Sequence, residues 1–276
     1  MLIKGQDISN IKLGNTLSDD QLKSNKFDYL LSNPPFGVDW KKTEKEIKTE
    51  HKKLGDKGRF GPGLPRVSDG SLLFLLHLVS KMRPVDKDHN GSRIGIILNG
   101  SPLFTGNPGS GESEIRRYLF ENDLVECIVA VPSDMFFNTG IPTYIWVLTN
   151  NKQKSRVGKV QLIDASENFE IIRRPLGDKR KMLSDNQIDQ IVKVFGEGKD
   201  KIVKNSKGGV VIDSRIFDNE DFGYSQITVH RPQRDEKGNI ITDSKKKPKS
   251  DIKLKDKENI PLVIQLKKKK TENYKL

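Results

Sequence analysis

One short run constrains this chain more than any other: Ser-Asn-Pro-Pro-Phe-Gly at positions 32–37, directly after the apolar stretch 27–31. An apolar stretch of this length is typical of a buried strand, and two consecutive prolines end it. Asn33 is therefore predicted at the carboxyl end of a strand, which is where open α/β sheets bind their ligands.

The residue before a proline is pushed into an extended conformation, which fixes the directions of the Asn33 side chain and the Pro34 carbonyl. Both groups accept hydrogen bonds, and Phe36 adds a flat apolar face beside them. Two acceptors aimed at one point form a receptor for an NH2 group on a planar ring. The alternative is an ordinary strand-ending turn in which Asn33 bonds its own backbone.

Asn-Pro-Pro-(Tyr or Phe) after a strand resembles the catalytic motif of S-adenosylmethionine-dependent methyltransferases that act on the exocyclic amine of adenine. The resemblance implies that the catalytic residues are Asn33, Pro34, Pro35 and Phe36. Two acceptors would favour a pyramidal amine with its lone pair aimed at the methyl group, so that no strong base is needed. Phe36 would stack on a base turned out of the duplex.

Further along the chain, strand-like and helix-like stretches alternate in a βαβαβ order. Strands are predicted at about 93–98, 124–131, 143–149 and 160–163, and helices at about 71–82, 112–121 and 185–195. The strand at 143–149 has no helix before it and is expected to return antiparallel. Residues 40–57 are charged and non-periodic, residues 196–250 are only weakly periodic, and no element is assigned to either.

Three more segments follow the Asn-Pro-Pro-Phe motif in an order and spacing similar to the modification subunit of type I restriction systems. They are Asp69-Gly70-Ser71, the stretch 91–104, and the stretch 135–143. The resemblance implies a site-specific, adenine-specific DNA methyltransferase subunit that transfers a methyl group from S-adenosyl-L-methionine to double-stranded DNA. It also implies two partners, a DNA-specificity subunit and a restriction (translocase) subunit.

By the same resemblance, Phe136 and Phe137 bind the substrate near the flipped adenine, and Asp69 helps form the pocket between substrate and cofactor. Asn15 stands where the family often has a cofactor-contacting polar residue. Core packing is the alternative for the two phenylalanines, and helix capping for Asp69. One cysteine, Cys127, and four scattered histidines provide no metal-ligand pattern, so no metal is expected.

The fold class implied is α/β: a Rossmann-like S-adenosylmethionine-dependent methyltransferase sheet, incomplete at its N-terminal half, with a partly helical, lysine-rich C-terminal extension. Only 32 residues precede Asn33, and they lack the expected glycine-rich turn, so the chain is interpreted as a fragment. Residues 1–170 are predicted to be the C-terminal portion of the catalytic domain. Residues 171–235 are predicted to be a helical or irregular extension for subunit or DNA contact, and residues 236–276 a disordered tail.

The net charge of +12 is concentrated in residues 245–276, which hold twelve lysines. Like-charge blocks of this kind are usually solvated, and nucleic-acid binding is the alternative. The first residues lack the apolar core of a signal peptide, and no run approaches the length needed to cross a bilayer. These features favour a cytoplasmic protein without membrane contact.

Two other functions stay open from the sequence. Methylation of RNA or of a protein glutamine amide is one, because an amide NH2 and a purine amine fit the same pair of acceptors. A truncated, non-catalytic interaction subunit is the other, and the absent glycine-rich turn motivates it. For the same reason the isolated chain is expected to hold S-adenosylmethionine poorly or not at all.

Overall fold

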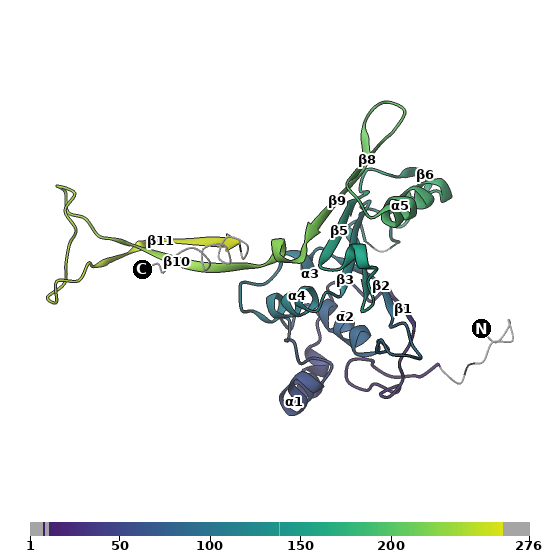
Figure 1. Ribbon diagram of the computed structural model, residues 1–276, viewed down its shortest axis with the longest axis horizontal. Helices are drawn as coiled ribbons and strands as arrows, with labels where there is room; N and C mark the ends of the chain where they lie inside the picture. Colours follow the sequence, from purple (N-terminus) through teal and green to yellow (C-terminus); the bar gives the residue numbers. More distant parts are fainter. Residues whose placement is uncertain (1–7, 9–10, 138, 262–276) are drawn as a thin grey trace. The chain divides into compact units, whose positions relative to one another are not determined.

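The computed structural model describes residues 8, 11–137 and 139–261 (Figure 1). The chain divides into two compact units, Met1–Asn219 and Glu220–Leu276. The first unit contains a seven-stranded sheet and a separate two-stranded ribbon. The strands of the sheet are β1 (Tyr29–Ser32), β2 (Arg93–Asn99), β3 (Val125–Val131), β4 (Thr143–Thr149), β5 (Lys159–Asp164), β8 (Lys201–Lys204) and β9 (Val210–Asp218).

The ribbon consists of β6 (Glu170–Leu176) and β7 (Lys179–Met182). The helices of this unit are α1 (Glu44–Leu54), α2 (Ser71–Ser80), α3 (Ser101–Phe104), α4 (Gly111–Glu121) and α5 (Asp185–Glu197). No helix in the described part of the chain is long and apolar enough to span a membrane. The strands and helices predicted at the apolar stretches are confirmed, with no end shifted by more than two residues.

The strands of the large sheet follow the order β1-β2-β4-β3-β5-β9-β8. β4 pairs antiparallel with both β2 and β3, whereas β1 is parallel to β2 and β3 is parallel to β5. The antiparallel direction expected for β4 is confirmed. β4 lies between β2 and β3, so the carboxyl ends of β1, β2, β3 and β5 meet at one edge of the sheet.

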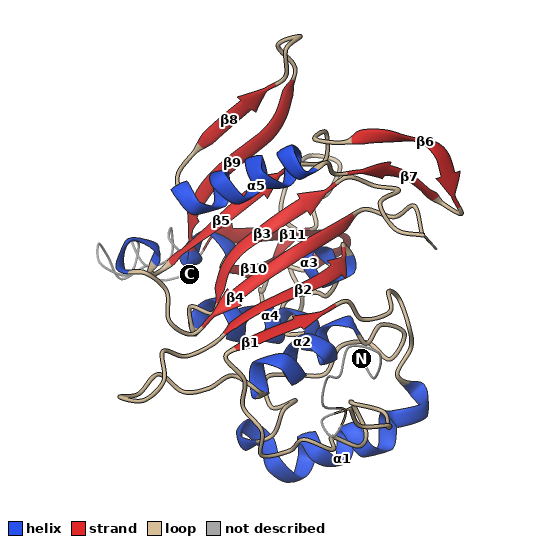
Figure 2. Cartoon of the chain, turned by 90° about the vertical axis from the view of Figure 1, so that its right-hand side faces the viewer, coloured by secondary structure: helices blue, strands red, loops and turns tan. Residues whose placement is uncertain are grey.

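Helices cover the two faces of the sheet unequally (Figure 2). α2 and α4 lie behind the strands, and the buried side chains of β2 on that face include Ile96, which pairs with Trp146 of β4. α5 lies on the other face, where Ile191 and Val194 pack with Val129 and other residues of β3 and β5. Alternate residues of a strand point to opposite faces, so the strands at the centre are apolar on both sides.

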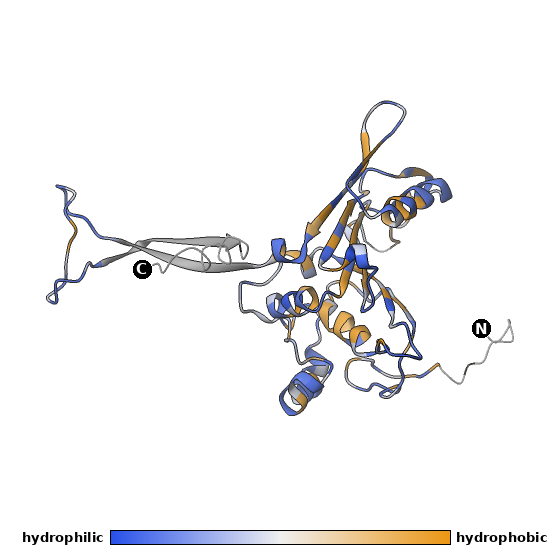
Figure 3. Ribbon diagram, in the orientation of Figure 1, coloured by the Kyte–Doolittle hydropathy of each residue, from blue (hydrophilic) through white to orange (hydrophobic). Residues whose placement is uncertain are grey.

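α1 lies in the charged stretch 40–57, where the sequence assigned no element, and this is a correction. Its residues are mostly glutamate and lysine, which are good helix formers, and Glu44 pairs with Lys48 one turn later. Ile47 is its one fully buried side chain. One buried residue in three turns leaves no apolar stripe, and α1 is accordingly hydrophilic along most of its length (Figure 3).

The sheet extends past residue 170, where the sequence placed the end of the catalytic portion. β9 pairs antiparallel with β5, and β8 pairs antiparallel with β9. Residues 171–235 therefore contain two strands of the large sheet instead of a wholly helical or irregular extension. The sequence signal was weak because these strands lie at the edge and bury few side chains, with Ile212 the one fully buried hydrophobic residue between them.

The second unit contains β10 (Tyr224–Pro232) and β11 (Ser250–Pro261), which pair antiparallel. Between them, Asp235 accepts backbone N–H bonds from Lys237 and Asn239 in a tight turn. Local turns and the β10–β11 ladder thus account for the described part of this unit, and the disordered tail expected for residues 236–276 stays a prediction. The remaining residues of the predicted tail, 262–276, lie outside the described residues.

A polar network joins the segment before β1 to the helices of the first unit. The Arg59 guanidinium donates to the carbonyl oxygens of Thr16 and Leu17 at 2.8 and 2.9 Å. It also pairs with the Glu50 carboxylate at 2.6 Å and donates to Nδ1 of His77 at 3.1 Å. Because a guanidinium can only donate, the His77 ring accepts and is neutral.

A buried ion pair extends this network to the end of α2. Lys81 Nζ lies 2.6 Å from the Asp20 carboxylate, and the two side chains are 5% and 9% exposed. The same ammonium donates to the carbonyl oxygen of Leu22. Paired and hydrogen-bonded in this way, the two charges hold the segment around residue 20 against α2.

We expect the stability of the protein to fall as the pH drops from about 6.5 to about 4. Burial and the neighbouring Arg59 guanidinium lower the pKa of His77 to about 4, so the unfolded chain binds a proton in this interval that the folded chain does not. Over this pH interval the free energy of unfolding of His77→Gln should decrease by on the order of 1–3 kcal/mol less than that of the wild type. Urea unfolding followed by circular dichroism at several pH values measures the effect.

The matched control is His89→Gln, a change at a surface turn where His89 contacts the exposed Asp86 carboxylate. It should leave the loss between pH 6.5 and 4 at the wild-type size. Equal pH slopes for the wild type and the His77 variant would show that His77 is protonated normally in the folded state.

Candidate active site

The Asn-Pro-Pro-Phe motif leaves the sheet at the carboxyl end of β1, as predicted. Ser32 is the last residue of the strand, Asn33 is exposed and Pro34 is buried. Within the part of the chain that the structure describes, the Asn33 side chain makes no hydrogen bond, so it does not bond its own backbone. Its carboxamide is available to an external group.

The segment after the motif is clamped to the loop before α2. The Trp40 backbone N–H donates to the Val67 carbonyl, and Gly70 N–H donates to the Val38 carbonyl, both at 3.0 Å. The indole Nε1 of Trp40 donates to the Arg66 carbonyl at 2.9 Å, and Trp40 is 3% exposed. These bonds hold residues 38–40, which follow Phe36 in the chain, against the loop at residues 66–70.

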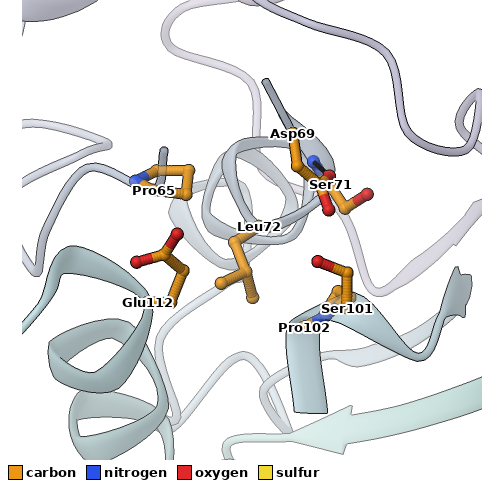
Figure 4. A pocket seen from close by; sticks show the side chains of 7 residues that line it. All are labelled: Pro65, Asp69, Ser71, Leu72, Ser101, Pro102 and Glu112. Atoms are coloured by element: carbon orange, nitrogen blue, oxygen red, sulfur yellow. Dashed lines mark hydrogen bonds between the residues drawn. The ribbon is translucent and has the colours of Figure 1, made fainter. Parts of the chain in front are cut away.

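Asp69 lies in this clamped loop and lines a small pocket of about 170 Å³, counted with its opening to solvent. The other lining residues are Pro65, Ser71, Leu72, Ser101, Pro102 and Glu112 (Figure 4). Asp69 accepts the backbone N–H of Ser71 at 3.0 Å, in a turn one residue before Gly70, the N-cap of α2. Burial raises its pKa, but hydrogen bonds from Ser101 and Ser71 outweigh this effect, and the pKa lies below its ordinary value.

The contacts of Asp69 among the described residues are with Ser71, Ser101 and Arg66, and none is with Asn33. It is 6% exposed. The structure therefore shows Asp69 as an ionised residue that orders the start of α2 and the turn after β2. Its assignment to a pocket between substrate and cofactor stays a prediction.

Phe36 and Phe136 come together from segments a hundred residues apart in the chain. Their ring centroids are 5.8 Å apart and the planes meet at 78°, an edge-to-face contact. Both side chains are half-buried. The contact joins the turn after β1 to the loop between β3 and β4, and so places a partly exposed aromatic surface close to Asn33.

Phe137 points to a different neighbour. Its carbonyl oxygen accepts the backbone N–H of Asp178 at 3.0 Å, and its ring lies against Gly177, in the turn between β6 and β7. The side chain is 60% exposed. The structure thus separates the two phenylalanines, with Phe136 against the Asn33 turn and Phe137 against the ribbon.

Asn15 is exposed and lies in a local turn, where its side-chain oxygen accepts the N–H of Leu17 at 3.0 Å. Its NH2 group remains able to donate to a ligand. Its contacts among the described residues include none with Asn33, Phe36 or Phe136, so the structure does not join it to the other predicted site residues.

Two further pairs at the same edge escaped the sequence analysis. Phe104, 77% exposed, contacts Tyr144 edge-to-face at 6.4 Å between ring centroids. Asn99 and Thr143 are register partners at the end of β2 and the start of β4, and each has a buried side-chain oxygen without a hydrogen-bond partner among the described residues. Buried polar atoms are ordinarily satisfied, so these oxygens are candidates for a ligand contact, a role that strand register alone could have suggested.

The site is built from neutral acceptors and aromatic rings. No group of three or more His, Cys, Asp or Glu in the described residues could hold a metal ion. Burial raises the pKa of the Cys127 thiol, which makes it an inert core residue. The arrangement suits the recognition and orientation of a planar amine.

Comparison with known proteins identifies the family. A family model described as N-6 DNA Methylase matches residues 1–222. The chain belongs to this family. It is 30% identical over 208 residues to the type I restriction enzyme MjaIX methylase subunit of Methanocaldococcus jannaschii, a match that covers 73% of this chain and 34% of the relative.

A second relative is the type I restriction enzyme HindI methylase subunit of Haemophilus influenzae, which is 33% identical over 196 residues. That match covers 70% of this chain and 38% of the relative, so the chain spans about a third of the length of these family members. The crystal structure of a type I restriction-modification system methyltransferase subunit from Streptococcus thermophilus has a TM-score of 0.62 at 25% identity. The match covers 80% of this chain and 41% of that one. The family and the α/β methyltransferase fold inferred from the motifs are confirmed.

The contact between Phe36 and Phe136 should be measurable as a coupling energy. We expect Phe36→Leu and Phe136→Leu to be non-additive in urea unfolding by about 0.5–1.5 kcal/mol, because an aromatic pair contributes this much beyond its buried area. Phe36→Leu combined with Phe104→Leu is the control, since these rings do not pair with each other, and it should be additive. A coupling energy no larger than that of the control pair would argue against the contact.

Proposed function

We propose that this chain carries the adenine-binding catalytic motif of a type I restriction-modification methyltransferase subunit, which methylates the exocyclic amine of adenine in double-stranded DNA. One observation supports this above all: the Asn33 carboxamide has no partner among the residues that the structure describes, and an aromatic pair lies beside it. The family and its named relatives support the reaction class.

Asn33 and the Pro34 carbonyl would accept the two hydrogens of the adenine amine. This removes the amine from conjugation with the ring and aligns its lone pair, which is catalysis by orientation and electrostatic preorganisation. The side chain is neutral, so it would not take a proton from the amine. The amine would lose its proton to solvent after the methyl group has passed from the sulfonium to the nitrogen. Phe36, supported by Phe136, would stack on the extruded base.

S-adenosyl-L-methionine is the proposed methyl donor, and its sulfonium would supply the methyl group. The residues at Asn33 fit the methyl-acceptor side of this reaction. On the donor side, Asn15 offers a free NH2 group but does not by itself form a cofactor pocket. The roles proposed for Asn15, for Asp69 in the substrate pocket and for Phe137 near the base rest on the family resemblance.

The proposed partners are a DNA-specificity subunit and a restriction (translocase) subunit, because the relatives are named as methylase subunits of type I restriction enzymes. A subunit of this kind acts on cellular DNA, and a cytoplasmic location is proposed for this reason. The neutral character of the site also suits RNA or protein-amide substrates, so the assay must include them.

We expect Asn33→Ala to lower methyl transfer by on the order of a hundredfold or more, because it removes one of the two acceptors aimed at the amine. The measurement uses a chimera in which this chain replaces the matching segment of the HindI methylase subunit. Methyl transfer is followed with labelled cofactor and duplex DNA. Asn186→Ala is the control, since Asn186 is also exposed but lies on α5. It should keep full activity.

The same assay tests the substrate with structured RNA and with a glutamine-containing protein. Label in RNA or protein alone would overturn the DNA assignment. A chimera that is folded and binds its partners but transfers no label to any substrate would favour the interaction-subunit interpretation. Near-normal transfer by the Asn33 variant would mean that other residues position the amine.

A further inference from the structure

The ribbon formed by β6 and β7, residues 170–182, is named here the basic hairpin. It holds five basic side chains and two carboxylates. Its strands pair antiparallel outside the large sheet, with Glu170 opposite Met182 and Leu176 opposite Lys179. Figure 2 shows it beyond the end of β3, at the edge where β1 also ends.

Backbone hydrogen bonds attach the basic hairpin to the loop between β3 and β4. The N–H groups of Arg180 and Lys181 donate to the Asp134 carbonyl at 2.9 and 3.1 Å, and Asp178 N–H donates to the Phe137 carbonyl at 3.0 Å. Gly177 has a φ of +59°, and a Cβ atom there would lie 2.6 Å from the same carbonyl oxygen. The hairpin therefore has a fixed place next to the loop that carries Phe136.

Most of the positive charge of the hairpin is unpaired within the described part of the chain. Among the described residues, Arg173, Arg174 and Lys179 form no ion pair, and Arg180 bonds only the Gly177 carbonyl in its own turn. Arg173 and Arg174 are exposed. Elsewhere in the same unit, arginine side chains are paired, as in Arg59–Glu50, Arg93–Glu126 and Arg117–Glu121.

Unpaired like charges on one short ribbon repel one another, and an anion that binds between them removes this repulsion. A regularly spaced polyanion that reaches the Phe36–Phe136 contact lies next to the loop that carries Phe136, and the hairpin is attached to this loop. The phosphate backbone of a duplex is such a polyanion, and arginine and lysine are its usual protein contacts.

We propose that the basic hairpin binds backbone phosphates of duplex DNA, with Arg173, Arg174 and Lys179 as the contacting residues. This inference rests on the proposed function, because it takes the occupant of the Asn33 site to be a base of the same DNA. Phosphate contacts position a protein on DNA without reading its sequence. The hairpin thus adds affinity and orientation, and sequence readout is left to other surfaces.

The test is equilibrium binding of a fluorescent duplex to the full 276-residue chain, followed by anisotropy over a range of salt concentrations. In the variant Arg173→Gln/Arg174→Gln/Lys179→Gln we expect affinity to fall about tenfold or more. The slope of log K against log[salt] should decrease by about three, because each removed cation no longer neutralises a phosphate. The backbone bonds that hold the hairpin involve none of these side chains, so the fold should persist.

The matched control is Lys45→Gln/Lys52→Gln/Lys53→Gln on α1, which lies far from the hairpin in both views (Figures 1 and 2). It removes the same net charge, and glutamine keeps the helix propensity. We expect its affinity and salt slope to stay close to the wild type. Equal decreases in both triple variants would mean that net charge alone is responsible and would overturn the proposal.

Other outcomes separate the hairpin from the function on which it rests. If the wild type binds the duplex and the hairpin variant matches it, the hairpin assignment is wrong and the DNA substrate stands. If the wild type fails to bind duplex DNA even at low salt, both proposals fall. If an RNA hairpin binds more tightly than DNA and loses its affinity in the hairpin variant, the partner is RNA.

Discussion

The antiparallel placement of β4 between β2 and β3 is the constraint on which the candidate site depends. Because β4 runs against both neighbours, the loop from β3 to β4 starts and ends at the edge where β1 also ends. That geometry lets Phe136 reach Phe36 across the width of β2. A parallel β4 would need a crossover to the opposite edge, so the chain after Phe136 would leave this edge instead of turning back along it.

Sequence alone predicted the parts of the fold that bury dense apolar runs. The strands of the centre and the apolar helix α2 have such runs, and Ser184 supplies the capping box that marks the start of α5. Asn33 could be placed at a strand end because two prolines stop β1 whatever the rest of the chain does. Residues close together in the sequence determine these elements, so short stretches of sequence were enough to predict them.

The remaining features depend on contacts between distant segments. α1 buries one residue fully, Ile47, and no apolar pattern marks it. The pairing of Phe36 with Phe136 follows from strand order, which periodicity does not specify. The same is true of Phe137, whose neighbour Gly177 belongs to a ribbon that the sequence showed only as a pair of arginines before a proline. Two adjacent phenylalanines looked like one recognition element, and the fold gives them different neighbours.

That separation has a mechanical consequence. Residues adjacent in the chain cannot move independently, so a force on the ribbon reaches the Phe36–Phe136 contact through the loop between β3 and β4, to which the ribbon is bonded at the Asp134 and Phe137 carbonyls. Phe36 and Phe136 are half-buried, whereas Trp40 anchors the other side of the Asn33 turn in the core. One side of the site is therefore rigid and the other is tied to an exposed, charged ribbon. An anion bound by that ribbon would hold this second side of the site in place before any chemistry begins. Binding energy from groups remote from the reacting atoms would in this way help to orient a neutral catalytic motif.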